Sequence, residues 1–202
     1  MYFIIATSYL LGSIPFGYLL VRIFRGEDVR RSGSGNIGAT NVSRKSPVLG
    51  VLTLLLDSAK GFAAVMLAAK FAPDADAVHL QRAMAIACLF AIAGHMFPAW
   101  LGFCGGKGVA TALGAFLRFA PTAVAVAVLV FLAVVLISRR ISLGSIVTAA
   151  LFPSTVWMLK LSKDPIVLLL IGTSALMIVG RHYENIRRLL SGQEPRFTLG
   201  RK

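Results

Sequence analysis

Long apolar segments separated by short polar stretches constrain the fold of this chain more than any other feature. A helix that spans a bilayer needs about 20 predominantly apolar residues, and only the fourth segment is much shorter than that. Helices satisfy their own backbone hydrogen bonds in lipid. The sequence therefore predicts an all-α, polytopic integral membrane bundle of about seven transmembrane helices, at residues 2–24, 48–71, 82–103, 108–119, 121–138, 142–160 and 165–180.

Composition supports a membrane protein and limits its partners. Charged residues make up only 14% of the chain, whereas a soluble domain carries roughly a quarter, and the mean hydropathy is +0.79. The net charge of +13 fits nucleic acid, anionic lipid or an anionic substrate. No soluble basic face remains beside the apolar segments, so we expect no nucleic acid partner. Cys88 and Cys104 lack metal-ligand spacing and are interpreted as packed thiols.

Charge also predicts the topology. Positive residues follow the first apolar segment, which indicates a permanent anchor with the N-terminus outside and the C-terminus cytoplasmic. The loop at 72–81 instead holds Asp74 and Asp76. The cytoplasmic basic clusters are Arg22, Arg25, Arg30, Arg31, Arg44 and Lys45, then Arg139 and Arg140, then Arg181, Arg187, Arg188, Arg196, Arg201 and Lys202. Seven crossings satisfy this pattern. One long helix over 108–138 is the alternative, and Pro121 favours a break there. A single domain over 1–202 is expected.

Three polar stretches then share the cytoplasmic face, and the first resembles a dinucleotide-binding turn. They read "SGSGNIGATNVSR" (32–44), "CGGKGVAT" (104–111) and "RHYENIRRLLSGQE" (181–194). Gly33, Gly35 and Gly38 fit G-x-G-x-x-G, but the charged "RGEDVRRS" precedes them where a Rossmann fold needs a strand. The stretch is therefore interpreted as a phosphate-binding loop of another kind.

The first stretch has the chemistry of an anion site. Its glycines let backbone N–H groups approach an anion closely, and a short helix beginning near Gly38 would add its positive end. Arg44 offers a planar fork suited to phosphate oxygens. The neutral donors are Ser34, Asn36, Thr40 and Asn41.

The second stretch resembles a Walker A loop without being one. That motif would need glycine at Leu101 and a hydroxyl at Gly108, so nothing indicates ATP. The remaining elements are Lys107, the glycines Gly105, Gly106 and Gly108, and Thr111 one turn into the following helix. They predict a second anion site at the membrane boundary.

The third stretch follows the last apolar segment. His182 and Asn185 are three residues apart and share a helical face. The histidine is a candidate general base, anion donor or interfacial hydrogen-bonding group. Glu184 and Glu194 are expected to neutralise neighbouring arginines.

Ionisable residues also lie within the apolar segments. Asp57 and Lys60 in "LLLDSAKGF" are spaced to pair on one helical face that points into the bundle. They are either a helix-packing ion pair or a support for the loops, and His95 is expected to be buried and hydrogen-bonded.

Two predicted phosphate-binding sites beside a bilayer indicate an enzyme that joins two phosphorylated substrates to form a lipid. The chain also resembles a known family. The stretches "GSIPFGYLL", "SGNIGATNVSR", "LLDSAKGF", "GHMFPAWLGFCGGKGVAT" and "RHYENIRRLLSGQE" resemble those of the bacterial PlsY-type acyl-phosphate:glycerol-3-phosphate acyltransferases over nearly all 202 residues. Cys104 departs from the family pattern, which has lysine before "GGKG".

The resemblance implies a multi-pass enzyme of the bacterial inner membrane that makes lysophosphatidic acid and phosphate from acyl phosphate and glycerol 3-phosphate. It implies no cofactor, no acyl-CoA, and an interaction with the enzyme that produces acyl phosphate. Lys107, the Gly105–Gly108 backbone and His182 are then expected to hold glycerol phosphate. The donor is expected on Ser34, Asn36, Thr40, Asn41 and Arg44, with Asn185 bridging and the acyl chain leaving sideways into lipid.

Two other classes of function are compatible with parts of this pattern. A lipid phosphatase or alcohol phosphotransferase usually needs carboxylates that hold Mg²⁺ or a histidine nucleophile, and no second acidic ligand accompanies Asp57. An anion transporter gated by Asp57 and Lys60 would move phosphate across sealed vesicles without forming an acylated product.

Overall fold

The described part of the chain folds into helices and connecting loops, as predicted. A computed structural model describes residues 1–72 and 76–197, and it contains no strand over that range. Asp74, Arg201 and Lys202, which contribute to the charge pattern, lie outside the described residues. The chain divides into two compact units, Met1–Phe119 and Ala120–Lys202. The expectation of a single domain over 1–202 stays a prediction.

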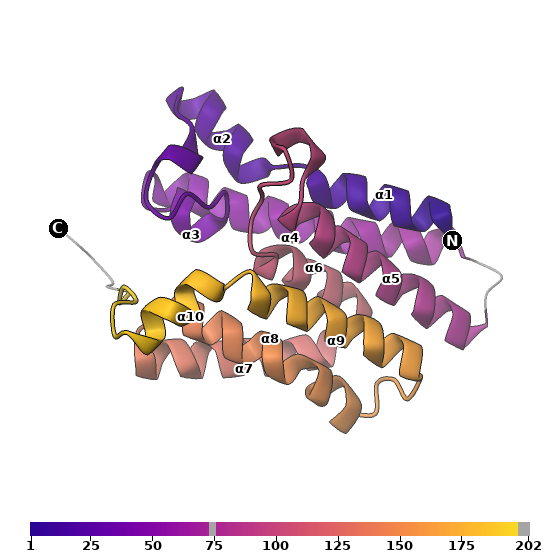
Figure 1. The fold of residues 1–202 in the computed structure, drawn as a ribbon. Coiled ribbons are helices and arrows are strands. Elements are labelled where there is room, and N and C mark those ends of the chain that lie inside the picture. Colours follow the sequence, from indigo (N-terminus) through magenta and orange to yellow (C-terminus); the bar gives the residue numbers. More distant parts are fainter. Residues whose placement is uncertain (73–75, 198–202) are drawn as a thin grey trace. The chain divides into compact units, whose positions relative to one another are not determined.

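The first unit is built around α4 and carries both glycine-rich loops. Helices α1, α4, α5 and α6 pack along one another, whereas α2, η1 and α3 gather at one end of the unit (Figure 1). Ser46 accepts a hydrogen bond from Leu49 N–H at the start of α4, with Pro47 in the first turn, as expected for a helix N-terminus. The elements are α1 (Tyr2–Ser13), α2 (Phe16–Arg25), η1 (Val29–Arg31), α3 (Ala39–Val42), α4 (Pro47–Lys70), α5 (Ala77–Met96), η2 (Ala99–Leu101) and α6 (Val109–Phe119).

Glycines allow the helices of this unit to approach closely. A Cβ atom at Gly12 of α1 would overlap the backbone of α5 at Ala91, and one at Gly61 of α4 would overlap the backbone of α6 at Thr111. Because lipid is as apolar as the helix surfaces, such small residues replace the hydrophobic effect as the main contributors to helix association in membranes. These two glycine crossings fix the bundle that supports the loops.

The second unit contains α7 (Pro121–Ser138), α8 (Ile141–Met158), α9 (Pro165–Gly180) and α10 (Tyr183–Leu190). Helix α8 packs against each of the other three. Proline occupies the first turn of α7 and of α9, where its missing N–H has no helical partner to lose. Asp164 caps α9 by accepting from Ile166 and Val167 N–H.

The predicted apolar segments correspond to helices, but one of these helices is too short to cross a membrane. Within residues 1–72 and 76–197, five helical stretches are long and apolar enough to cross a membrane, or six if α9 and α10, bent by 57°, count as one. Helix α6 has 11 residues, about half of what a crossing needs. The predicted break at Pro121 is confirmed because α6 ends at Phe119 and α7 begins at Pro121. Seven crossings and the orientation of the termini stay predictions.

Candidate active site

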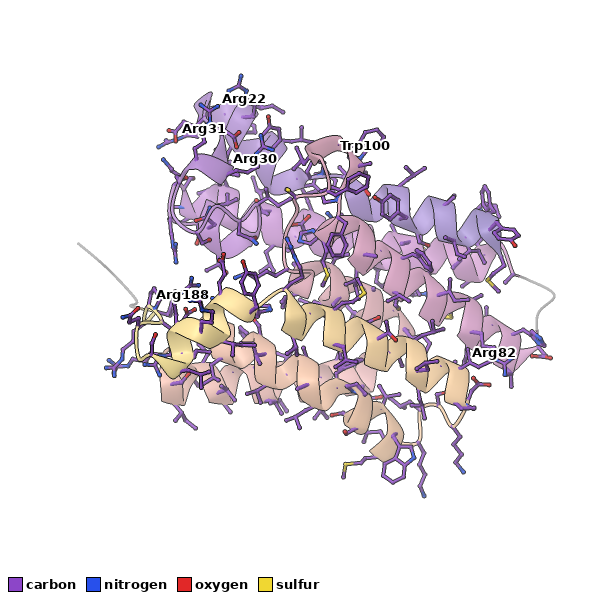
Figure 2. The ribbon with its side chains drawn as sticks, viewed as in Figure 1. Arg22, Arg30, Arg31, Arg82, Trp100 and Arg188 are labelled. Carbon is purple, nitrogen blue, oxygen red and sulfur yellow. The ribbon has the colours of Figure 1, made fainter. Side chains whose placement is uncertain are left out.

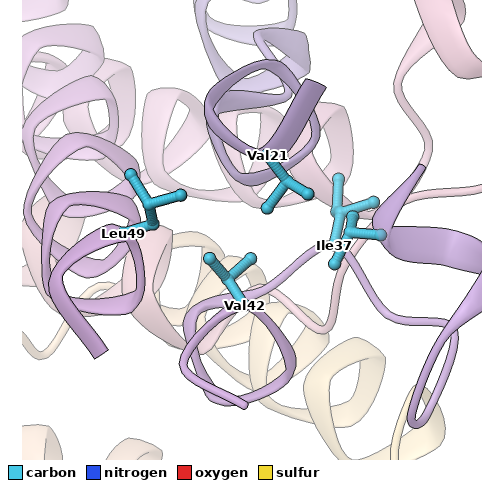
Figure 3. Close-up of a cluster of buried hydrophobic side chains, with 5 residues drawn as sticks. Val21, Ile37, Val42 and Leu49 are labelled. Atoms are coloured by element: carbon cyan, nitrogen blue, oxygen red, sulfur yellow. The ribbon is translucent and has the colours of Figure 1, made fainter. Parts of the chain in front are cut away.

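A buried apolar cluster holds the first glycine-rich loop against the helices of the first unit. Figure 3 shows this cluster, which takes one side chain from each of α2, η1, the loop, α3 and α4: Val21, Val29, Ile37, Val42 and Leu49. Leu101 of η2, on the chain that leads to the second glycine-rich loop, packs against the same cluster. The two loops therefore lie at the same end of the first unit.

Asn41 organises the interior of the first loop. Its Nδ2 atom donates to the carbonyl oxygens of Val29 (3.2 Å), Ser32 (3.0 Å) and Asn36 (2.9 Å), and its Oδ1 accepts from Ser34 N–H at 3.0 Å. The side chain is 3% exposed. Asn41 was predicted to donate to a bound anion, but these bonds occupy its donors, so its place in the site is that of a scaffold.

The remaining predicted residues of this loop leave polar groups at the surface. Gly33 and Gly35 have left-handed backbone torsions, with φ of 60° and 67°, which L-residues with side chains rarely adopt. A Cβ at Gly33 would lie 3.1 Å from a terminal nitrogen of Arg44, so the guanidinium lies over this glycine. Ser34 and Thr40 are exposed. Asn36 Oδ1 accepts from Gly38 N–H at 2.8 Å, and the predicted short helix, α3, begins just after Gly38.

Acidic residues neutralise some of the loop's cations and leave Arg44 without a carboxylate. Arg30 donates to both oxygens of Asp28, the shorter bond being 2.7 Å, and this guanidinium lowers the pKa of Asp28 to about 2. Lys45 donates to Glu27 at 2.7 Å and likewise lowers the pKa of that carboxyl. Across the described ranges, 1–72 and 76–197, Arg44 forms no ion pair. Its charge is therefore not cancelled by a carboxylate.

The arginines around α2 and η1 give this end of the unit a positive surface. Arg22, Arg30 and Arg31 gather there, and Arg82 lies at the far end of α5 (Figure 2). The guanidinium of Arg30 also stacks over the ring of Tyr18 at 4.9 Å, a cation–π contact that orders it.

The second glycine-rich loop folds back onto the end of α5. Gly105 N–H donates to Met96 O at 3.1 Å, and Gly106 N–H donates to His95 O at 3.0 Å. A Cβ at Gly105 would overlap His95 O, and one at Gly106 would overlap the His95 ring. These two N–H groups were predicted to contact an anion, but the structure directs them to α5. Gly105 and Gly106 serve close packing instead.

Lys107 and Gly108 follow this turn and lead into α6. Gly108 has φ of 84°, a left-handed conformation that glycine adopts without steric cost. Helix α6 begins at the next residue, Val109, and Thr111 is fully buried in its first turn. Lys107 is half-buried. Cys104 is exposed, so its interpretation as a packed thiol is wrong, whereas Cys88 is buried as expected. The lysine therefore sits where a glycine turn meets a helix N-terminus, a favourable position for an anion.

The predicted residues of the third stretch belong to the second unit. His182 Nδ1 lies 2.7 Å from Ile178 O, and because a carbonyl only accepts, this nitrogen carries a hydrogen. Asn185 Nδ2 donates to Glu194 Oε1 at 2.6 Å, and Arg188 Nε donates to Glu194 Oε2 at 2.7 Å. The expectation that Glu194 neutralises an arginine is confirmed, and Glu184 lies 3.9 Å from Arg188.

Glu194 is the centre of a hydrogen-bonded cluster that sequence reasoning did not identify. Its Oε1 also accepts from Ser142 at 2.5 Å, which ties the chain after α10 to the first turn of α8. Burial raises the pKa of Glu194, but the hydrogen bonds from Ser142, Asn185 and Arg188 outweigh it and lower the pKa below its ordinary value. Only the polar run after the last apolar segment could have indicated such a cluster.

The predicted ion pair within α4 is also present. Lys60 Nζ lies 2.8 Å from Asp57 Oδ1, and each side chain is 2% exposed. His95 is buried, as predicted, and its Nδ1 lies 3.0 Å from Lys60 Nζ. No sequence signal indicated that this histidine and the ion pair form one group.

These observations define a class: a multi-pass helical membrane protein with two glycine-rich, cationic loops at one end of its first unit. Residues 2–192 match the family described as Glycerol-3-phosphate acyltransferase, and the chain belongs to that family. The resemblance seen in the sequence is confirmed, and the protein is an integral membrane glycerol-3-phosphate acyltransferase that acts in phospholipid synthesis.

Individual relatives match over almost their whole length. The glycerol-3-phosphate acyltransferase of Desulfotalea psychrophila is 45% identical over 188 residues, which are 93% of each chain. That of Desulforamulus reducens is 44% identical over 200 residues, 98% of this chain and 95% of the relative.

A solved structure matches as well. It is a crystal structure of PlsY (YgiH), an integral membrane glycerol 3-phosphate acyltransferase, in its glycerol 3-phosphate form. It has a TM-score of 0.88 at 37% identity and covers 97% of this chain and 94% of its own. A lysophosphatidic acid form of the same protein matches with a TM-score of 0.85 at 36% identity.

Proposed function

We propose that the protein transfers an acyl group from acyl phosphate to the 1-hydroxyl of glycerol 3-phosphate. The products are 1-acyl-glycerol 3-phosphate (lysophosphatidic acid) and inorganic phosphate. The enzyme works in the bacterial inner membrane and receives its donor from the enzyme that produces acyl phosphate. The observation that carries this proposal is the packing of two glycine-rich, cationic loops on one apolar cluster, through Ile37 and Leu101, because the reaction joins two phosphorylated substrates.

The first loop is suited to the phosphate of the donor. Arg44 has no carboxylate partner in the described part of the chain, and its guanidinium lies beside Gly33, whose missing Cβ leaves room for it and for Asn41 Oδ1. Ser34, Thr40 and Asn36 supply neutral donors. Gly35 N–H donates to Ser32 O and Gly38 N–H donates to Asn36 Oδ1, so these two glycines shape the loop that carries the donors. Asn41 holds the loop in this shape. An arginine fork and neutral donors on a rigid loop are the recurring elements of phosphate recognition.

The second loop is suited to glycerol phosphate. Lys107 supplies a point charge that neutralises the phosphate, and Gly108 and the first turn of α6 with Thr111 add backbone N–H groups. Gly105 and Gly106 fix the loop on α5. On the resemblance to the family, we assign His182 to the same substrate and Asn185 to a bridging role.

The reaction needs no covalent enzyme intermediate. An acyl phosphate is a mixed anhydride and is already activated. The oxygen of the 1-hydroxyl forms a bond to the acyl carbon, the bond between that carbon and the phosphate oxygen breaks, and phosphate leaves with the electron pair. The protein overcomes the repulsion between two anions, aligns them and stabilises the developing oxyanion.

The hydroxyl proton has two candidate acceptors. In neutral His182 the hydrogen on Nδ1 faces Ile178 O, which puts the lone pair on Nε2, the atom that a general base uses. The departing phosphate is the other acceptor. Replacing His182 by alanine separates them: the rate of the chemical step at saturating substrate falls by about a hundredfold or more if His182 is the base, and hardly changes if phosphate is.

The donor assignment is tested with purified protein, labelled glycerol 3-phosphate and either acyl phosphate or acyl-CoA at equal concentration. We expect labelled lysophosphatidic acid and an equal amount of phosphate with acyl phosphate, and only background product with acyl-CoA. Turnover with acyl-CoA that matches or exceeds turnover with acyl phosphate would contradict the proposal.

A further inference from the structure

Lys60 connects three elements of the first unit through its buried ammonium group. Besides Asp57 on its own helix, Nζ donates to Ile14 O at 2.7 Å and lies 3.0 Å from His95 Nδ1 of α5. An ammonium group has three hydrogens and accepts nothing. Nζ therefore donates to Ile14 O and to His95 Nδ1, and its 2.8 Å contact with Asp57 Oδ1 is an ion pair without hydrogen-bond geometry.

Ile14 O is available because α1 and α2 are separate helices. Helix α1 ends at Ser13 and α2 begins at Phe16, with Pro15 between them. In a continuous helix the carbonyl of Ile14 would accept from Tyr18 N–H, whereas here it accepts from Phe16 N–H at 3.1 Å and from Lys60 Nζ. The chain break that precedes the first loop is thus fixed by a side chain from the centre of α4.

His95 carries the connection to the second loop. Because Lys60 can only donate, His95 Nδ1 accepts and the hydrogen of the neutral ring is on Nε2. That edge of the ring lies against Gly106, where a Cβ would overlap Nε2 and lie 2.8 Å from Cε1. The backbone oxygen of His95 also accepts from Gly106 N–H at 3.0 Å. Both the ring and the backbone of this residue therefore support the turn before Lys107.

We propose that Asp57, Lys60 and His95 form a positioning network that sets the Gly105–Gly108 loop in place for glycerol 3-phosphate. This inference rests on the proposed role of Lys107 in binding that substrate. Helix packing alone does not require the network, because Gly61 and Gly114 already provide the close approach of α4 to α6, and apolar residues of similar size replace a buried ion pair at little cost to stability. The contact of His95 with Gly106 serves the second loop instead, and the bond from Lys60 to Ile14 O anchors the network at the break between α1 and α2.

The test removes the charges together, because a lone buried carboxylate would unfold the protein. The double variant Asp57→Asn/Lys60→Met keeps side-chain volume, and Lys70→Met, an exposed lysine at the end of α4, is the control. We expect a folded, monodisperse double variant whose KM for glycerol 3-phosphate rises by about tenfold or more, because a small displacement of a binding group costs that much. The KM for the acyl donor should change by about twofold or less, since the apolar cluster and Asn41 hold the first loop independently. Lys70→Met should match the unmodified protein in both.

Hydrogen exchange measures how firmly the Gly105–Gly108 loop is held, and it does so in the absence of any ligand. The amides of Gly105 and Gly106, which donate to Met96 and His95, should exchange about tenfold faster or more in the double variant. A folded double variant with unchanged exchange of these amides and an unchanged KM for glycerol 3-phosphate would overturn the positioning role. The role would also be overturned if activity fell equally with both substrates in proportion to a loss of folded protein. Faster exchange with an unchanged KM supports the network and contradicts the assignment of glycerol phosphate to this loop.

Discussion

Replacing Asn41 by aspartate should loosen the first loop far more than the same change at Asn36. Aspartate keeps the acceptor for Ser34 N–H but loses the donations to the carbonyls of Val29, Ser32 and Asn36. The three carbonyls share the two hydrogens of Nδ2, so a net contribution of about 1 kcal/mol for each hydrogen bond gives roughly 2 kcal/mol. Local opening of the loop should therefore become about thirtyfold more frequent, since 1.36 kcal/mol is a factor of ten.

Asn36→Asp is the matched control because it places the same charge in the same loop. Asn36 Oδ1 accepts from Gly38 N–H, and an aspartate retains that acceptor. Hydrogen exchange of peptides covering residues 32–38 should accelerate about thirtyfold in Asn41→Asp and by about threefold or less in Asn36→Asp. Equal acceleration in the two variants would refute the scaffold role of Asn41.

Two further predictions concern the second loop and the second unit. Gly106→Ala should destabilise the protein by about 1–3 kcal/mol, because the new methyl group overlaps the buried His95 ring. Gly172→Ala is the control and should not lower the melting temperature, because its methyl group meets no atom within 4 Å. Equal melting temperatures of the two variants would contradict the packing of Gly106 against His95. The folded pKa of Glu194 lies below its ordinary 4.5, so this carboxylate stabilises the fold above that pH and loses the effect as pH falls through the lower folded value. Melting temperatures of Glu194→Gln should therefore depend less steeply on pH below about 4.5 than those of the unmodified protein, and parallel pH profiles would count against the cluster.

The helices could be predicted from the sequence because their signals are local. Runs of apolar residues predicted the helices, and Pro121 predicted the break between α6 and α7. The spacing of Asp57 and Lys60 predicted that they pair. The break between Ser13 and Phe16 was not predicted, although Pro15 within an apolar run is a physical sign of it.

The interior contacts of the loops could not be predicted, because they join residues far apart in the chain. Asn41 and Ser34 look equally suited to bind an anion in the sequence, and only the fold turns one inward and leaves the other exposed. Likewise the sequence predicted that Gly105 and Gly106 bind an anion, and only the structure shows that they pack against the end of α5. A glycine that permits close packing and one that admits a ligand have the same sequence signal.

Binding measurements on two single variants test the central claim that each loop holds one phosphorylated substrate. Calorimetry with glycerol 3-phosphate and a non-hydrolysable acyl phosphonate gives both affinities for Arg44→Ala and Lys107→Ala. We predict that Arg44→Ala weakens only the acyl phosphonate, and Lys107→Ala only glycerol 3-phosphate, each by about ten- to a hundredfold, the usual effect of losing a charge-assisted hydrogen bond. If both variants weakened both ligands alike, or neither ligand was affected, the assignment of one substrate to each loop would be wrong.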